Sequence, residues 1–285
     1  MRLSKFFLFT CMAVAFAGMV ACNNAGSGDT TADTTKKATG PSVSEDAVSY
    51  PSETDSVTLN GFVAYDANSN AKRPVVLVVH EWWGLNDYVR GRAKQLAEMG
   101  YLAMAVDMYG NGKTGDDPAA AGALASPFYS NPQLVKARID AALTRIKQHP
   151  QADTTNIAAI GYCFGGSVVL NAARLGEDFK GVVSFHGDLR GPATSKDLLK
   201  AKILVCHGAA DSFVPQEQVD QFKKSMDSLG ADYTLKVYDS ATHAFTNPNA
   251  TEVGKKHNLP IAYNAAADSA SWNDMKAFFA RIFPR

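Results

Sequence analysis

Cys163 is the residue on which catalytic chemistry in this chain would centre. It stands in a G-x-C-x-G motif, residues 161–165, which follows the short apolar run 157–160 and precedes an apolar segment of helical pattern, 167–175. A strand, a sharp turn and a helix in this order are typical of a nucleophile elbow, where strand and helix approach so closely that only glycine fits. The dipole of the helix N-terminus favours a thiolate there. A glycine-rich turn with a buried thiol is the alternative for the motif alone.

A thiol nucleophile needs a base within hydrogen-bond reach, and the base needs a carboxylate that fixes its tautomer. Asp211 and His243 follow Cys163 in the order nucleophile, acid, base, which is the chain order of the α/β-hydrolase fold. Among the six histidines, His243 is the one in the loop directly after the last predicted strand; His257 lies farther on, in a polar loop. Asp107 precedes Cys163 and breaks this order, and Asp188 remains a candidate pocket residue.

Strands and helices alternate along the chain, which predicts an α/β fold with a doubly wound, mostly parallel sheet and helices on both faces. The predicted strands are 56–65 (one or two), 75–79, 101–106, 157–160, 181–185, 202–206 and 233–238; the predicted helices are 87–99, 118–126, 132–149, 167–175, 215–229 and 263–282. In such sheets ligands bind at the carboxyl ends of the strands. Six chemically capable side chains fall at these ends: Glu81, Tyr109, Cys163, His186, Asp211 and His243.

The N-terminus has the features of a lipoprotein signal. Arg2 and Lys5 precede an apolar stretch too short to span a bilayer comfortably, and small residues lead to Cys22. We expect a signal peptide over residues 1–21, lipidation of Cys22, and export to the cell envelope, on the periplasmic side or the cell surface. An ordinary signal peptide cut nearby is the alternative. Residues 22–50 are rich in small polar residues and predict a flexible tether; the domain is expected over 51–285.

Composition narrows the possible partners. The formal net charge is zero and no basic stripe is present, so nothing favours nucleic acid. After signal removal only Cys163 and Cys206 remain in the folded domain, so no disulfide framework is expected. The histidines and carboxylates show no metal-ligand spacing, so we expect no metal and no cofactor. We expect a monomeric domain held to the membrane by the lipid at Cys22.

Several motifs, spaced in one order from about residue 56 to the C-terminus, resemble the dienelactone hydrolase family. They are His80-Glu81-Trp82-Trp83-Gly84, residues 105–109 ending in Asp107-Met108-Tyr109, residues 161–166 around Cys163, residues 208–215 around Asp211, and His243-Ala244-Phe245. The resemblance implies an α/β-hydrolase fold and a Cys163–His243–Asp211 triad. It implies hydrolysis of an ester, lactone or thioester through an acyl-cysteine, and a glutamate, Glu81, that contacts the resting thiol.

The same resemblance suggests the remaining site residues. The backbone N–H groups of Trp82 and Phe164 would form the oxyanion hole, and Trp83, Tyr109 and His186 would line the pocket. Two arginines that bind a substrate carboxylate in this family are missing: residues 110–113 and 246–248 stand where they are expected. Lys113 and Arg190 are the nearest substitutes. The fold and triad therefore carry over, and the dienelactone substrate does not.

Two other functions remain possible at this stage. A non-catalytic binding lipoprotein could use a hydrolase scaffold, although all three triad residues are present, which argues against it. A redox thiol protein would need a resolving cysteine, and Cys206 has no C-x-x-C relation to Cys163. Fold alone does not decide among such functions.

Overall fold

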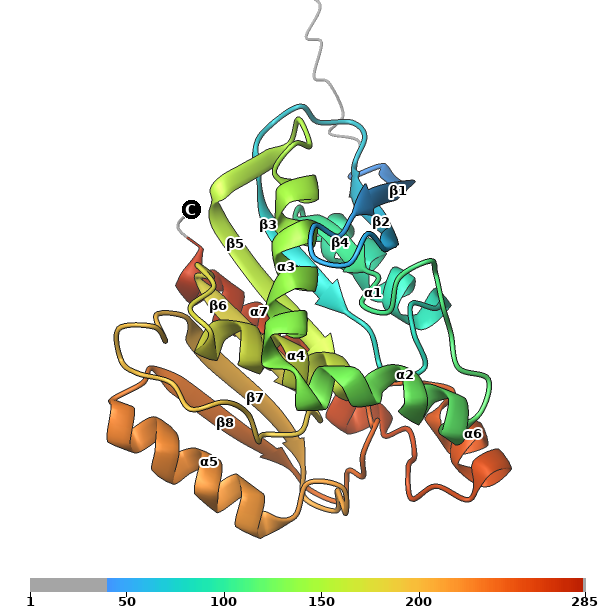
Figure 1. Cartoon of the computed structure of the whole chain (residues 1–285), viewed down its shortest axis with the longest axis vertical. Helices are drawn as coiled ribbons and strands as arrows, with labels where there is room; N and C mark the ends of the chain where they lie inside the picture. The colour runs from blue at the N-terminus through green and yellow to red at the C-terminus, as the bar shows by residue number, and fades with distance from the viewer. Residues whose placement is uncertain (1–39, 284–285) are drawn as a thin grey trace, which may run out of the picture. The chain divides into compact units, whose positions relative to one another are not determined.

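Runs of aliphatic residues form a sheet of eight strands in the order β1-β2-β4-β3-β5-β6-β7-β8 (Figure 1). The computed structural model describes residues 40–283. The first two strands pair antiparallel, β2 pairs antiparallel with β4, and all other neighbours run parallel. The strands are β1 Val43–Pro51, β2 Thr58–Asp66, β3 Arg73–Val79, β4 Leu102–Val106, β5 Ala152–Tyr162, β6 Gly181–Phe185, β7 Lys202–Gly208 and β8 Tyr233–Tyr238.

Helices connect the parallel strands and cover both faces of the sheet. They are α1 Asp87–Glu98, α2 Pro118–Ser130, α3 Pro132–Ile146, α4 Phe164–Arg174, α5 Gln216–Leu229, α6 Ala250–His257 and α7 Ala265–Ile282. Polar side chains begin several of them: Asn86, Asp117, Asn131 and Asn264 each accept a backbone N–H of the first helical turn. The predicted α/β-hydrolase architecture, with a mostly parallel sheet and helices on both faces, is confirmed.

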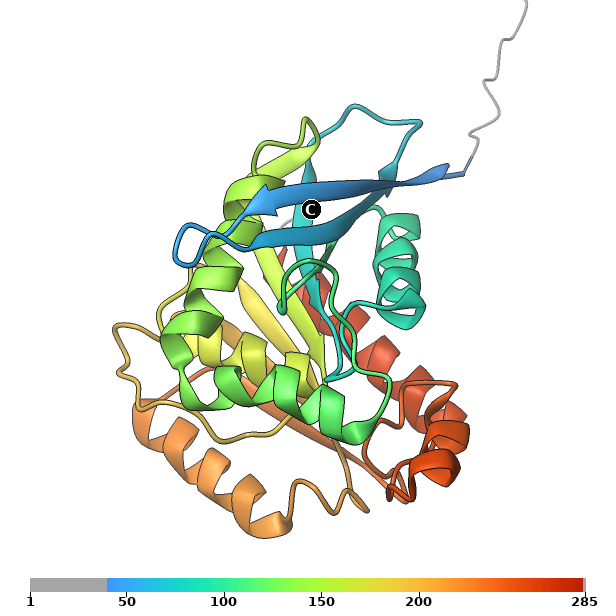
Figure 2. The same cartoon turned by 45° about the vertical axis from the view of Figure 1, so that its right-hand side comes forward.

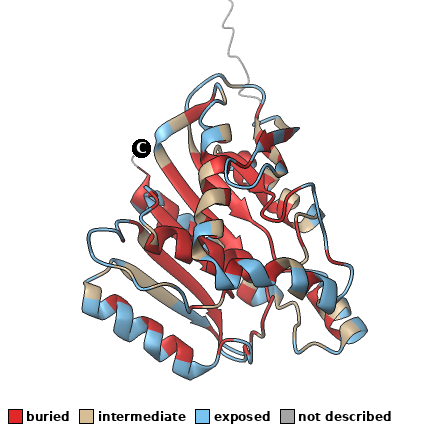
Figure 3. Ribbon diagram, in the orientation of Figure 1, coloured by how far each residue is buried: buried red, intermediate tan, exposed pale blue. Residues whose placement is uncertain are grey.

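The two faces of the sheet follow from the alternation of side chains along each strand. In β3, Val75, Leu77 and Val79 pack into one hydrophobic core with α2, α3, α4 and α5. Val76 and Val78 point the other way, into a second core with α1 and α7. Burial on both sides explains why the central strands consist almost wholly of aliphatic residues (Figure 3).

The N-terminal strand corrects the predicted domain boundary. Residues 43–50 were expected to belong to a flexible tether, whereas Val43–Pro51 forms β1, paired over its whole length with β2. Figure 2 shows this antiparallel pair at the edge of the sheet. The domain therefore begins by Val43 and not at residue 51. The predicted signal peptide and Cys22 lie outside the described residues.

A second difference concerns the segment before the last helix. No helix was predicted between residues 239 and 262, but Ala250–His257 forms α6. Several predicted elements are also longer than expected: β5 begins at Ala152, and α4 begins at Phe164, directly after the cysteine. Within residues 40–283, no helix has both the length and the apolar character needed to cross a bilayer.

Candidate active site

Cys163 occupies the turn between β5 and α4 with a backbone that few non-glycine residues adopt, φ 52° and ψ −114°. The flanking glycines are required by close approach. A Cβ on Gly161 would lie 2.0 Å from the carbonyl oxygen of Gly165, and one on Gly165 would lie 2.3 Å from that of Val79. The predicted elbow is thus confirmed as a backbone geometry. Its effect is to hold the thiol at the first turn of α4, facing a cleft.

His243 and Asp211 meet at the same cleft. Nδ1 of His243 lies 2.8 Å from Oδ2 of Asp211, and the other carboxylate oxygen accepts the backbone N–H groups of Phe213 and Val214. Burial lowers the pKa of His243, but the negative charges of Cys163 and Asp211 and their hydrogen bonds outweigh it and raise the pKa to about 10. The geometry therefore favours a protonated His243 between Cys163 and Asp211.

Glu81 is a buried carboxyl that also lines this cleft. Its Oε2 accepts a hydrogen bond of 2.7 Å from the side-chain amide of Asn247. Burial raises the pKa of Glu81 to about 7, because the Asn247 hydrogen bond and the positive charge of His243 compensate only part of the desolvation. Glu81 can therefore change its charge near neutral pH.

The backbone around the predicted oxyanion hole is tightly supported. The first N–H groups of a helix have no intrahelical acceptor, so that of Phe164 remains available at the start of α4. Trp82 lines the cleft, and its carbonyl accepts a 2.8 Å hydrogen bond from the Tyr109 hydroxyl. Tyr109 was predicted to line the pocket, which is wrong: it is not among the residues that line the cleft, and it packs behind Phe164, with ring centroids 5.4 Å apart.

His186 was also predicted to line the pocket, and it does not. It is 1% exposed, and its Nδ1 accepts a hydrogen bond of 3.1 Å from the backbone N–H of Cys163. The same N–H also donates to the carbonyl of Phe185. With Nδ1 an acceptor, Nε2 carries the proton and donates to the hydroxyl of Thr246 at 2.7 Å. Burial, then the positive charges of His243 and Arg92, hold the pKa of His186 well below its usual value.

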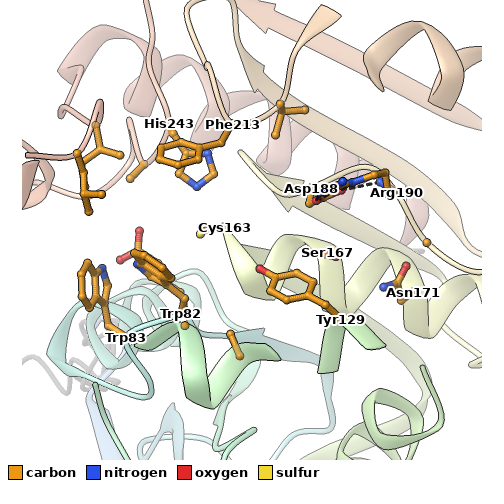
Figure 4. A pocket seen from close by; sticks show the side chains of 18 of the residues that line it. Trp82, Trp83, Tyr129, Cys163, Ser167, Asn171, Asp188, Arg190, Phe213 and His243 are labelled. Atoms are coloured by element: carbon orange, nitrogen blue, oxygen red, sulfur yellow. Dashed lines mark hydrogen bonds and ion pairs between the residues drawn. The ribbon is translucent and has the colours of Figure 1, made fainter. Parts of the chain in front are cut away.

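The cleft has a volume of about 620 Å³ and opens around Cys163 (Figure 4). Trp83 lines it as predicted, and Arg190 and Asp188 reach it as an ion pair. Lys113, the other proposed substitute cation, is not among its lining residues. Sequence reasoning missed several others from separate elements: Tyr129, Ser167, Asn171, Phe213, Val214, Leu259 and Ile261. Ser167 and Asn171 had a usable signal, because they follow Cys163 at helical spacing.

The positions where the family's arginines were expected hold other groups. Thr246 and Asn247 follow the His243 loop and bond to His186 and Glu81. Asp107 accepts four backbone N–H groups, those of Asn60, Tyr109, Gly110 and Gly112. Asp107 therefore fixes the loop after β4, and no hydrogen bond joins it to His243 within the described residues. Among residues 40–283 there is no cluster of three side chains that could hold a metal ion.

Residues 59–283 match the family described as the dienelactone hydrolase family. The chain belongs to the dienelactone hydrolase family. It is a hydrolase of that family, and its curated relatives include a putative carboxymethylenebutenolidase of Escherichia coli (strain K12), 28% identical over 242 residues, 81% of this chain and 84% of the relative. Protein usf of Aquifex pyrophilus is 27% identical over 232 residues, 80% of this chain and 95% of the relative.

Solved structures agree with this placement in the dienelactone hydrolase family. A dienelactone hydrolase-like promiscuous phosphotriesterase from metagenomic libraries is 32% identical, with a TM-score of 0.79 over 85% of this chain and 99% of that one. A putative dienelactone hydrolase from Klebsiella pneumoniae shares the fold at 24% identity, with a TM-score of 0.71 over 84% of this chain and 99% of that one.

Proposed function

We propose that this chain hydrolyses an ester, lactone or thioester through a covalent acyl-cysteine on Cys163. The observation that supports this most directly is the meeting of three groups at one cleft. They are a thiol on a strained elbow, a histidine whose pKa is raised to about 10, and a buried carboxylate 2.8 Å from that histidine. A non-catalytic binding protein would not need this charge arrangement.

The first step forms a bond between Sγ of Cys163 and the scissile carbonyl carbon. The carbonyl π electrons move to oxygen, where the N–H groups of Trp82 and Phe164 would stabilise the charge. The tetrahedral intermediate collapses, and the leaving oxygen takes the proton of the His243 imidazolium. Neutral His243 then removes a proton from water, which attacks the thioester. The acid leaves, and the thiolate and imidazolium are restored.

Glu81 would set how much of the resting thiol is ionised. A carboxylate close to Cys163 opposes a thiolate, while His243 and the N-terminus of α4 favour it. The pKa of about 7 means that Glu81 is partly protonated at neutral pH. Its hydrogen bond from Asn247 connects it to the loop that carries His243.

The substrate expected here is uncharged near its scissile carbonyl. The relatives named putative carboxymethylenebutenolidase suggest a lactone or a small ester. The cleft next to Cys163 presents Trp82, Trp83 and Phe213, and lacks the arginine pair of the family. An uncharged acyl group fits such a surface better than a carboxylate.

The test is turnover of a panel of chromogenic esters, lactones and thioesters by the purified protein. We expect Cys163→Ala to abolish turnover and the acyl adduct that mass spectrometry would detect on the wild type. Cys206→Ala is the matched control, because Cys206 is buried in β7 and burial raises its pKa to about 12. Wild-type rates for Cys163→Ala would overturn the proposal.

We also propose export and lipid anchoring through Cys22, on the sequence features of residues 1–22 alone. Cys22→Ser should move the protein from the membrane fraction to the soluble fraction or block processing. Unchanged partition together with unchanged mass would contradict lipidation.

A further inference from the structure

Two polar side chains lie in a line with the nucleophile on one face of α4. Ser167 and Asn171 follow Cys163 at spacings of four and eight residues, so they share its face of the helix. The helix rise places them about 6 and 12 Å along the axis from Cys163. Both line the cleft although they are only 3% and 7% exposed. Figure 4 shows both on the side of Cys163 away from Trp82 and Trp83.

The orientation of the Asn171 amide follows from its neighbour. Oδ1 of Asn171 accepts a hydrogen bond of 3.2 Å from Arg174, and a guanidinium can only donate. The oxygen must therefore face Arg174, which leaves the NH2 group for the cleft. Within residues 40–283, neither this NH2 group nor the Ser167 hydroxyl has a hydrogen-bond partner. These are two nearly buried donors facing the cleft, with nothing in the described chain to accept from them.

The backbone of Gly191 packs against the hydrogen bond between Asn171 and Arg174. A Cβ on Gly191 would lie 2.1 Å from both Nη1 of Arg174 and Oδ1 of Asn171, so the backbone closes directly over that hydrogen bond. Arg174 is 5% exposed and also donates to the carbonyl of Leu189. Its charge is thus buried behind Asn171, where it polarises the amide and strengthens the N–H groups as donors.

The charges at this end of the cleft largely cancel. Arg190 lines the cleft, but its guanidinium is bound to the carboxylate of Asp188, two residues earlier (Figure 4). In this exposed ion pair the charges of Asp188 and Arg190 compensate each other, which leaves little net charge at this end of the cleft. Within residues 40–283, the uncharged donors of Ser167 and Asn171 are left without a protein partner at this end of the cleft.

We propose that Ser167 and Asn171 form a subsite for an uncharged hydrogen-bond acceptor of the substrate, such as an amide, ester or hydroxyl oxygen. The acceptor lies roughly 6 to 12 Å from the scissile carbonyl, the distance that α4 sets. On the opposite side of Cys163 the cleft presents the aromatic side chains of Trp82 and Trp83 (Figure 4). The substrate class is therefore a bipartite ester with one apolar part and one acceptor-bearing part. This inference rests on the proposed hydrolysis at Cys163.

The test compares matched esters that differ at one chain end. One carries a terminal amide whose oxygen lies at the stated distance, and the other carries an alkyl group of the same size. Two series place this chain on the acyl side and on the alcohol side. An apolar cleft alone favours the alkyl ester, because the amide must leave water without a partner. With the subsite, we expect wild-type kcat/KM to favour the amide in one series by roughly 2- to 10-fold for each hydrogen bond.

Variants decide whether these residues cause the preference. Asn171→Leu should reduce the amide-to-alkyl ratio to one or below. Ser167→Ala should reduce it by a smaller factor, and serves if Asn171→Leu misfolds. Gly191→Ala should also lower the ratio, because its methyl group displaces the Asn171–Arg174 pair. Asn70→Leu is the matched control. Asn70 is exposed in the connection between β2 and β3 and does not line the cleft, so this variant should keep the wild-type amide-to-alkyl ratio.

Two results are distinguishable. If wild type turns over both esters but prefers the alkyl chain in both series, or if Asn171→Leu and Ser167→Ala keep the wild-type ratio, the subsite is wrong and hydrolysis stands. If no ester acylates Cys163, the proposed function fails, and the subsite fails with it.

Discussion

Two buried histidines, His186 and His243, lie with their ring centroids 5.2 Å apart and have opposite proton affinities. His243 is bound to Asp211, and its pKa is raised to about 10. His186 is bound to the hydroxyl of Thr246, and its pKa is well below the usual value. Burial lowers the pKa of both, so the partners decide the outcome: Cys163 and Asp211 in one case, a hydroxyl in the other.

The difference also divides their roles. The region around His243 contains ionisable side chains, Cys163, Asp211 and Glu81. The region around His186 contains groups that hold backbone in place, since His186 accepts the N–H of Cys163 and Thr246 belongs to the loop that carries His243. The positive charge of His243 itself helps keep His186 neutral. His243 is thus readily protonated, whereas His186 stays neutral.

The largest effect should come from removing the carboxylate that distinguishes the two histidines. Asp211→Asn keeps the shape but can donate to Nδ1, which would fix the wrong tautomer of His243. We expect kcat/KM to fall by about 10³- to 10⁴-fold, as expected for a triad that loses its carboxylate. Ester hydrolysis measures it, with urea unfolding to show that the fold survives. A loss below tenfold would mean that His243 does not depend on Asp211.

The contrast between the histidines shows what the sequence could and could not predict. The aliphatic strands, the elbow glycines and the order of Cys163, Asp211 and His243 are local patterns, and they led to the fold and to three groups that meet. For His186 and Tyr109, the sequence predicted the position after a strand correctly, but it wrongly predicted that their side chains line the cleft. Position at a strand end does not determine where a side chain points, and both turn into the core behind the elbow.

Edges and short elements were missed for another reason. Strand β1 carries Ser44, Glu45 and Asp46 and is only partly buried, so its sequence lacks an apolar signature. Its pairing with β2 defines it, and pairing is not local. Helix α6 is eight residues long and mostly polar, yet the chain after it brings Leu259 and Ile261 to the cleft.

Glu81 offers a pH-dependent test of the His243 region. Its folded pKa, about 7, lies above the value of 4.5 of an ordinary glutamate, so protonation favours the folded state. That contribution is fully present below pH 4.5 and is lost as the pH rises through 7. Glu81→Gln keeps an acceptor for Asn247 and cannot ionise. We expect its unfolding free energy, relative to wild type, to rise by about 3 kcal/mol between pH 5 and pH 9.

Urea unfolding at the two pH values measures this difference. Glu98→Gln is the matched control, since Glu98 is exposed near the end of α1 and should show no such change. If the Glu81→Gln difference were constant with pH, Glu81 would be ionised in both the folded and the unfolded state, and burial would not raise its pKa.

Thr246→Val tests the His186 region. Valine has the same shape but leaves Nε2–H of His186 without an acceptor and removes a 2.7 Å hydrogen bond to the Tyr88 hydroxyl. We expect a loss of about 1 to 3 kcal/mol in the free energy of unfolding, together with slower alkylation of Cys163, whose backbone His186 supports. Thr234→Val, on strand β8, is the control. Unchanged stability for Thr246→Val would show that His186 finds another acceptor.

The smallest effect concerns charge on the substrate. The His186 region contains a buried cation, Arg92, close to where the family's second arginine was expected. It is 7% exposed and donates to the carbonyl of Thr246 at 2.8 Å and to Asp268 at 2.5 Å, so it is not available to a ligand. Of the residues that line the cleft within the described chain, Arg190 is the one arginine or lysine, and it is paired with Asp188.

A carboxylate beside the scissile carbonyl would therefore lose water without gaining a cation, which costs several kcal/mol unless it stays solvated. We compare kcat/KM for matched esters with and without that carboxylate. We expect either a preference for the neutral ester or a preference for the acid of less than about tenfold. A hundredfold preference for the acid, about 2.7 kcal/mol, would contradict this. Loss of such a preference in Arg190→Ala, but not in Lys113→Ala, would then show that Arg190 leaves Asp188 to bind the substrate carboxylate. Arg190 would in that case supply the positive charge that the family's two arginines provide.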